Sequence, residues 1–322
     1  MPQLRTDVEA LAAPSGRRVG TSGHEQAKSY LEGRLAELAL EPYADGRFAL
    51  GYRSGGIDFT NLVAVAPGRD RSLAPLLVGA HYDTVPSSPG ADDNAAAVGI
   101  ALAVAERLKA EPAQRDVVVA LFDAEEPPYF QTSSMGSTRF FHDQRLGPVQ
   151  AALVLDLVGH DVPLPGLEDL LFITGMESSE AFEPLVAEAG VPSGLRIVPT
   201  LNSYVGNLSD HHVFERNGVP FLFFSCGRWA HYHAPTDTPE KLNYGKMALI
   251  AELLEGLVRK VGAVGAASPG SPLPTGPYDS TATELRFMNR ALGPLAQQLG
   301  IRLEGRGDID QLAQRLLTLF QL

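Results

Sequence analysis

The sequence predicts an α/β protein: a three-layer sandwich in which a mixed, mostly parallel central sheet of about eight strands is flanked by helices. Two observations predict this class. Short apolar runs alternate along the chain with longer stretches whose apolar residues recur at helical spacing. In addition, the runs LLVGA, VVVALF and ALVLDLV are apolar almost throughout, as expected of strands that helices cover on both faces.

The individual elements follow from this alternation. Helical spacing first predicts helices over residues 3–12 and 23–39, with Ser22 placed to cap the second. The strand-like runs that follow are 46–53, 57–66, 75–80, 116–123, 151–158, 170–175, 195–199 and 219–225. The helical patterns between them are 94–110, 134–143, 178–189 and 210–217.

The last third of the chain changes in composition. A long helix is expected near 244–262, and the Pro/Gly/Ser-rich sequence AASPGSPLPTGP follows it. We therefore expect a main domain over 1–263, a linker over 264–279 and a C-terminal helical extension over 280–322. The two helices of this extension, near 280–299 and 308–321, are expected to pack on the main domain or to join two copies in a homo-oligomer.

Composition narrows the function classes. The net charge of −12 and the scattered arginines argue against a nucleic-acid partner. No apolar run reaches the roughly 18–20 residues that cross a bilayer, so no membrane partner is expected. The single cysteine, Cys226, excludes an intrachain disulfide and a cysteine-based metal site, and is expected to be buried. No signal peptide is visible at the start, which favours the cytoplasm unless a leader was removed.

Acidic and histidine side chains gather where buried strands are expected to end. One apolar run ends in His81-x-Asp83, and a Gly/Pro/Ser-rich loop then brings Asp92-Asp93-Asn94. A second apolar run is followed by Glu125-Glu126. Such residues at the carboxyl edge of a parallel sheet are typical of a metal site.

Each motif also has a plain structural explanation. The first pair could solvate a strand end, and one of Asp92, Asp93 and Asn94 is expected to cap the next helix. The metal interpretation is favoured because Asp83 can hold the second ring nitrogen of a metal-bound His81. Two adjacent acids after an apolar run are costly to bury without a cation. Because neighbouring side chains in an extended segment point apart, one acid can bind metal while the other faces the substrate.

Two further candidates lie downstream: Asp156 inside the strand-like AALVLDLVGH, and His233 in AHYHAPTDT. The whole set exceeds the four ligands of one zinc, so it suits two ions that share a bridge. His231 could take the place of His233. The remaining histidines have plainer explanations: Asp210-His211-His212 reads as a helix start with an internal hydrogen-bonded pair, and surface or loop positions are expected for His24, His142 and His160.

Over roughly residues 15–262 the chain carries a series of motifs in a fixed order: HxD…GADDN…AEE…LDLVGH…SDHxxF…YHxxxDT. This series resembles the metallopeptidase family of bacterial di-zinc aminopeptidases, plasma glutamate carboxypeptidase and glutaminyl cyclase. The resemblance implies the zinc aminopeptidase-like fold, two Zn²⁺ per chain and a cis bond at Asp93–Asn94. The implied ligands are His81 and Asp156 on one zinc, Glu126 and His233 on the other, and Asp93 as the bridge. The implied roles are general base for Glu125, orientation of His81 for Asp83, and stabilisation of the oxyanion for Tyr232.

The function implied by the resemblance is cleavage of an N-terminal peptide bond in a peptide or small amide, by a metal-activated water. One alternative is a single-zinc glutaminyl cyclase, against which the retained His81 argues. A carboxypeptidase or dipeptidase is another, if Arg228 meets a substrate carboxylate rather than lying on the surface. A non-catalytic binding module is the third, against which the complete set of acids argues.

The sequence departs from the family pattern after Glu126. The segment PPYFQTSSMGSTRFF is longer than the usual turn and carries Pro127, Pro128, Tyr129 and Phe130. Because it begins one residue after an implied ligand, we expect these four residues to line the entrance of the site and form an apolar pocket. The plain alternative is that Tyr129 and Phe130 pack beneath the loop and only stabilise it.

Overall fold

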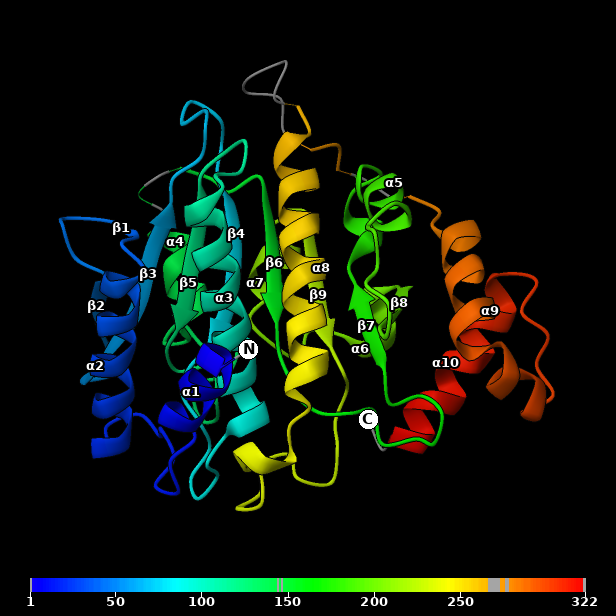
Figure 1. The fold of residues 1–322 in the computed structure, drawn as a ribbon, viewed down its shortest axis with the longest axis horizontal. Helices are drawn as coiled ribbons and strands as arrows, with labels where there is room; N and C mark the ends of the chain where they lie inside the picture. Colours follow the sequence, from blue (N-terminus) through cyan, green and yellow to red (C-terminus); the bar gives the residue numbers. More distant parts are fainter. Residues whose placement is uncertain (1, 144, 146, 266–272, 276–277, 321–322) are drawn as a thin grey trace.

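A nine-stranded mixed sheet runs through the molecule, with helices on both of its faces (Figure 1). The computed structural model describes residues 2–143, 145, 147–265, 273–275 and 278–320. The strands are β1 Glu41–Pro42, β2 Ala49–Ser54, β3 Ile57–Ala66, β4 Leu76–His81, β5 Val117–Phe122, β6 Ala151–Leu155, β7 Leu170–Thr174, β8 Arg196–Thr200 and β9 Phe221–Ser225. The helices are α1 Pro2–Leu11, α2 Ser22–Glu37, α3 Ala97–Ala110, α4 Gly136–His142, α5 Phe182–Ala187, α6 Asn202–Val205, α7 His212–Arg216, α8 Tyr244–Ala263, α9 Thr281–Gln298 and α10 Arg306–Phe320.

The order of the strands decides where the site lies. Along the sheet the order is β1-β3-β5-β4-β6-β9-β7-β8, and β2 pairs with β3. The four central strands β5, β4, β6 and β9 are mutually parallel, whereas β3 and β7 run antiparallel to their neighbours β5 and β9. The carboxyl ends of four neighbouring strands therefore meet at one edge, where α/β proteins commonly bind ligands.

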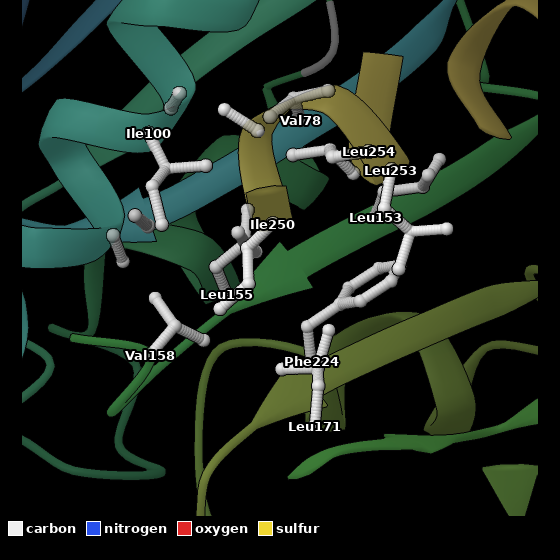
Figure 2. Packing of buried hydrophobic residues seen from close by; sticks show 14 of the residues in the cluster. Val78, Ile100, Leu153, Leu155, Val158, Leu171, Phe224, Ile250, Leu253 and Leu254 are labelled. Carbon is white, nitrogen blue, oxygen red and sulfur yellow. The ribbon is translucent and has the colours of Figure 1, made fainter. Parts of the chain in front are cut away.

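Buried aliphatic side chains hold the helices on the sheet. On one face, Ile100 of α3 and Ile250, Leu253 and Leu254 of α8 pack with side chains of the central strands (Figure 2). All four are at most 1 % exposed, and burying one such side chain contributes about 1.5–3 kcal/mol. On the other face a smaller cluster joins α4 and α7 to the sheet. The long helix α8 thus anchors the centre of the sheet that carries the site.

The predicted α/β class and all eight predicted strands are confirmed. The ninth strand, β1, has two residues and is too short to show a hydrophobic pattern. Three local expectations were wrong. Asp156 follows β6 directly instead of lying inside a strand. Thr21, not Ser22, caps α2 by accepting a hydrogen bond from the amide of His24.

The third wrong expectation is a cap on α3 from the Asp92–Asn94 motif. Residues Ala91–Ala96 form a π-helical turn in which Asp93 and Asn94 have non-helical backbone angles, and no side chain caps α3. The Asn94 side chain instead donates to the carbonyl oxygen of Leu155. The motif therefore joins the loop after β4 to the end of β6.

At the C-terminal end, α9 packs along the edge strand β8, and α10 lies beside α9 (Figure 1). Most of the expected linker over 264–279 lies outside the described residues. Among the described helices, none has the length and hydropathy that crossing a membrane would require.

Candidate metal centre

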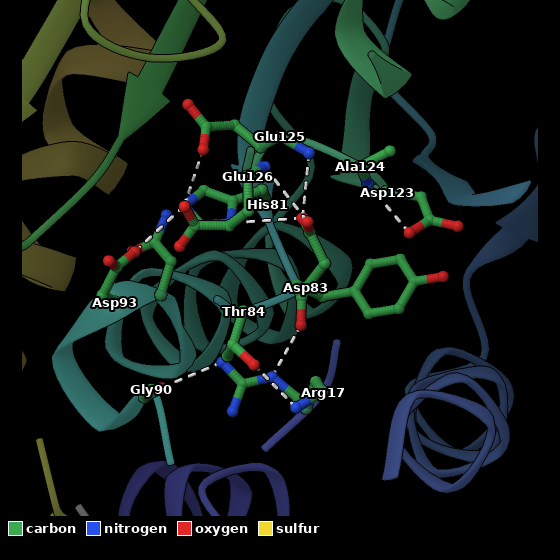
Figure 3. Close-up of polar contacts among 12 residues, drawn as sticks. Arg17, His81, Asp83, Thr84, Gly90, Asp93, Asp123, Ala124, Glu125 and Glu126 are labelled. Atoms are coloured by element: carbon green, nitrogen blue, oxygen red, sulfur yellow. Dashed lines mark hydrogen bonds and ion pairs between the residues drawn. The ribbon is translucent and has the colours of Figure 1, made fainter. Parts of the chain in front are cut away.

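The predicted site residues come together at the carboxyl edge of the parallel strands. His81 is the last residue of β4, Asp156 comes directly after β6, and Glu125 and Glu126 follow β5. His233 reaches the same edge from the long loop after β9. Asp93 reaches it from the segment between β4 and α3, and its peptide bond to Asn94 is cis. Figure 3 shows His81, Asp93 and the two glutamates facing one another above the strand ends.

Asp93 lies between the two histidines. Its Oδ1 is 3.3 Å from Nε2 of His81, and its Oδ2 is 3.2 Å from Nε2 of His233. Asp156 Oδ1 lies 3.7 Å from the same nitrogen of His81, and Glu126 Oε2 lies 3.1 Å from that of His233. The five side chains therefore form two groups, one around each histidine, that share a carboxylate.

The remaining acid of the pair, Glu125, adjoins the His81 group. Its Oε2 is 3.8 Å from Nε2 of His81, and its side chain is buried at the floor of a cavity. Glu125 and Glu126 owe their placement to Asp83, whose two carboxylate oxygens accept hydrogen bonds from their backbone amides at 3.0 and 3.1 Å. Asp83 also lies 3.5 Å from Nδ1 of His81, so one carboxylate orders both strand ends.

Two more carboxylates hold the neighbouring loops in the same way. Asp237 accepts hydrogen bonds from the backbone amides of Asp92 and Asp93 at 2.9 and 3.1 Å. Asp92 in turn accepts from the amides of Gly159 and His160, in the loop that follows Asp156. Asp237 belongs to the YHxxxDT pattern, but its spacing alone does not reveal this contact.

Arg17, in the segment between α1 and α2, supports the backbone that carries the site. The buried guanidinium of Arg17 donates to the carbonyl oxygens of Tyr82, Pro89 and Gly90, and so ties the end of β4 to the loop that carries Asp93 (Figure 3). No local sequence pattern marks this role of Arg17, because the three partners that tie it to the site are 65–73 positions away.

Two histidines expected on the surface or in loops are buried. His24 is 3 % exposed, and its Nε2 lies 2.8 Å from Oδ1 of Asp123, two residues before Glu125. His160 is fully buried, with Nδ1 2.7 Å from Asp92. In both cases the hydrogen-bonded carboxylate is far away in the sequence, so no local pattern marks the contact. His142 is exposed as expected.

The other histidines considered as metal ligands lie outside the group of five side chains described above. His231 is 2.8 Å from the hydroxyl of Thr236. His211 stacks between Phe221 and Phe223, and His212 Nδ1 is 3.2 Å from the carbonyl oxygen of Ser209. Within the described part of the chain, the side chains of Asp210, His211 and His212 form no hydrogen bond with one another, so the expected pair is absent. Cys226 is fully buried, as expected.

Burial and mutual repulsion dominate the electrostatics. Burial raises the pKa of Glu126 to about 8, and repulsion from Asp93 adds to the shift. The pKa of Glu125 is also raised by burial. Burial opposes protonation of His233, but the carboxylates of Asp93 and Glu126 outweigh it and raise its pKa to about 10. Acids packed this closely need positive charge nearby.

The donor set fits metal ions. Ligand atoms of His81, Asp93 and Glu126 all lie within 4.8 Å of one another. Both ring nitrogens of His81, Oε1 of Glu126 and Oδ1 of Asp156 are buried without a hydrogen-bond partner among the described residues. An unsatisfied buried polar atom costs about 1–3 kcal/mol, and bound cations would satisfy Nε2 of His81, Oε1 of Glu126 and Oδ1 of Asp156, while Nδ1 of His81 faces Asp83. Imidazole and carboxylate are common ligands of zinc.

A cavity of about 290 Å³ opens beside the cluster. Pro127 and Phe130 line it, but Tyr129 packs edge-on against Phe59 with ring centroids 5.0 Å apart, and Pro128 is exposed. The expectation that all four residues line the entrance was therefore wrong for Pro128 and Tyr129. The alternative of packing beneath the loop holds for Tyr129 alone.

The other side of the cavity mouth carries Arg228 and Tyr232. Both line the cavity, and the guanidinium of Arg228 lies 4.9 Å from the centre of the Tyr232 ring. Tyr232 also stacks on His233, and burial raises the pKa of its hydroxyl. Arg228 is therefore a half-buried cavity residue and not an isolated surface arginine.

Comparison with known proteins gives a consistent result. A family model described as Peptidase family M28 matches residues 61–258. The chain is 27 % identical to the uncharacterized protein YfbL of Escherichia coli over 61 % of this chain and 69 % of YfbL. It is 26 % identical to aminopeptidase YwaD of Bacillus subtilis, over 57 % of this chain but only 40 % of YwaD.

Solved structures support the fold. A glutaminyl cyclase from Tannerella forsythia superposes with a TM-score of 0.64 at 17 % identity, over 80 % of this chain and 97 % of that one. A Zn-dependent exopeptidase from Parabacteroides distasonis gives 0.63 at 16 % identity, with the same coverage. At these identities the likeness concerns the fold alone.

Proposed function

The chain belongs to peptidase family M28, and from that premise we propose that it is an aminopeptidase that hydrolyses N-terminal peptide bonds with two zinc ions. The observation that carries the proposal is the position of Asp93, whose two carboxylate oxygens face two different histidines at 3.2–3.3 Å. A carboxylate in this position suits a bridge between two metal ions.

In this proposal His81 and Asp156 would hold one zinc, Glu126 and His233 would hold the other, and Asp93 would be shared between them. The unsatisfied buried atoms of His81, Glu126 and Asp156 support the assignment. Asp83, 3.5 Å from Nδ1 of His81, orients that ring. When bound, zinc ions lower the pKa of water and polarise a substrate carbonyl group.

Glu125 is the general base. A carboxylate oxygen of Glu125 takes a proton from the attacking water and then gives it to the leaving amine. Its burial beside His81, outside the two ligand groups, supports this role. The hydroxyl of Tyr232 donates a hydrogen bond to the developing oxyanion, and its raised pKa keeps that hydroxyl protonated at neutral pH.

One observation favours a second candidate. Arg228 lines the cavity a short way from His233, and a guanidinium there could bind a substrate carboxylate, as a dipeptidase or carboxypeptidase requires. A panel of four substrates separates the aminopeptidase from a carboxypeptidase and a cyclotransferase: leucinamide, N-acetyl-leucinamide, N-acetylated leucyl dipeptide with a free carboxylate, and glutaminyl amide.

We expect zinc-loaded protein to hydrolyse leucinamide and to leave the acetylated compounds intact, with two zinc ions per chain by elemental analysis. Cleavage only of the substrate with a free carboxylate would replace the proposal by a carboxypeptidase. Cyclisation of the glutaminyl amide, without hydrolysis of leucinamide, would replace it by a cyclotransferase.

A further inference from the structure

The cavity beside the candidate metal centre has a wall that the family match does not include. One wall consists of side chains at alternate positions near the ends of three strands, where Thr174, Thr200 and Ser225 share a face with Phe172, Val198 and Phe223. The opposite wall comes from α9 and α10, beyond residues 61–258. Its members are Met288, Leu292, Leu312, Ala313, Leu316 and Leu317.

The two ends of this cavity differ in charge. The charged side chains that line it, in the part of the chain that the structure describes, are the four acids of the cluster, His233 and Arg228. Among the described residues of α9 and α10, those that line the cavity are all uncharged. A substrate would therefore place its reacting amide at the cluster and an apolar side chain toward the two helices.

The wall is held in place by a polar network. The carboxylate of Glu284 in α9 is fully buried and accepts hydrogen bonds from both terminal nitrogens of Arg306, at 2.9 and 2.6 Å. It also accepts from Thr200 of the opposite wall at 3.2 Å. In addition, the hydroxyl of Tyr204, another cavity residue, bonds to Asp310 of α10. The two helices are thus hydrogen-bonded to the cavity residues Thr200 and Tyr204, in addition to packing on the outer edge of the sheet.

We propose that α9 and α10 form the specificity wall of the substrate pocket, and that the preferred substrates carry a large aliphatic or aromatic side chain on the acyl side of the scissile bond. This inference rests on the proposed function, since it takes the metal centre as the reacting end. The volume of about 290 Å³ lies near the lower end of the range for ligand pockets, which suits one bulky side chain.

The test is to fill the cavity from α10. Leu316→Trp places a larger side chain on the wall, and Ala313→Leu does so more gently if the first variant does not fold. Gln314→Trp is the matched control, because Gln314 is exposed on the same helix and does not line the cavity. The measured quantity is kcat/KM for alaninamide, leucinamide and phenylalaninamide, with thermal melts to confirm folding.

We expect Leu316→Trp to lower kcat/KM for leucinamide and phenylalaninamide by about 10- to 200-fold, with much less change for alaninamide. The control should keep the wild-type ranking. An unchanged ranking in both filled variants, or an equal loss for all three substrates, would overturn the proposal.

Calorimetric binding of phenylalaninamide separates this inference from the proposed function. If the wild type binds phenylalaninamide but cleaves none of the amides, and Leu316→Trp abolishes binding, the pocket stands and the aminopeptidase assignment fails. If the wild type cleaves the amides with an unchanged ranking in the variants, the assignment stands and the pocket fails. Absence of both cleavage and binding would overturn both.

Discussion

Glu125 and Glu126 are neighbours in the chain but have different surroundings. Glu126 lies 3.1 Å from Nε2 of His233, whereas Glu125 lies 3.8 Å from Nε2 of His81, and both line the cavity. The backbone amides of Glu125 and Glu126 both donate to one carboxylate, that of Asp83. A conservative substitution at either position therefore tests a different role without moving the backbone.

Glu125→Gln should retain zinc but lower kcat by about 10²–10⁴-fold, because the amide cannot take up the proton. Glu126→Gln should instead lower the zinc content, since a ligand loses its charge. Elemental analysis together with kcat measured on leucinamide checks both outcomes. Loss of zinc in the Glu125 variant, with retention in the Glu126 variant, would exchange the two roles.

His211 gives a prediction for pH dependence. Its ring stacks on Phe223 with centroids 4.1 Å apart, and burial lowers its pKa to about 3. In the unfolded chain the pKa is about 6.5, so below pH 6.5 the unfolded state binds a proton that the folded state does not. Stability is therefore lost as pH falls from 6.5 toward 3.

For metal-free protein we expect this loss to be on the order of 3 kcal/mol, and His211→Gln to lack it. Urea unfolding of both proteins between pH 7 and pH 4 measures the difference. Parallel stability curves for wild type and variant would show that His211 does not cause the loss.

At the scale of elements, the loop after β5 divides its aromatic residues between two tasks. Phe130 lines the cavity, whereas Tyr129 packs edge-on against Phe59. The two adjacent aromatics therefore form a matched pair, in which one substitution reports on the pocket and the other on the loop.

Phe130→Ala should lower kcat/KM for leucinamide and phenylalaninamide by about 10-fold or more, with little effect on alaninamide. Tyr129→Ala should keep the substrate ranking and lower the melting temperature, since aromatic pairs contribute about 0.5–1.5 kcal/mol beyond the area they bury. The same change of ranking in both variants would contradict the division.

The contact between α9 and α10 depends on a buried charge. Arg306→Met leaves the Glu284 carboxylate in the interior without its cation, and breaking a buried pair in this way costs about 3–5 kcal/mol. We expect a lower free energy of unfolding, measured in urea. Adding Glu284→Gln to the variant should restore part of the loss, because the uncompensated charge is gone. No recovery in the double variant would show that the loss comes from packing of the arginine stem.

For the whole molecule, local sequence patterns predicted the sheet and the group of site residues, but not the long-range hydrogen bonds that hold them in place. Buried strands are recognisable from runs such as VVVALF, and His81 and Glu125 stand out as polar residues where such runs end. Arg17 and His24 do not, because their partners Gly90 and Asp123 lie 73 and 99 positions away. The same reason hid the contact of the C-terminal helices with the cavity, which depends on how α9 docks on β8.

Metal binding should stabilise the whole chain, because the proposed ligands come from the ends of four strands and the loops that follow them, and the unfolded chain does not hold them together. An ion at about 100 times its Kd stabilises the folded state by about 2.7 kcal/mol, and for a domain of this size each kcal/mol shifts Tm by about 2–4 °C. A chelator should thus lower Tm by about 5–10 °C, and Zn²⁺ should restore it.

The pH dependence of this effect identifies the cluster as its source. Without metal, the raised pKa values of Glu126 and His233, about 8 and about 10, mean that the folded state holds protons that the unfolded state releases. The contribution of these two groups to the stability of the metal-free protein then falls as pH rises from 5 to 8, opposite in sign to the contribution of His211. Bound zinc displaces those protons, so the gap in Tm between loaded and chelated protein should widen over the same range. A gap that is constant with pH, or absent, would place the stabilising ion elsewhere.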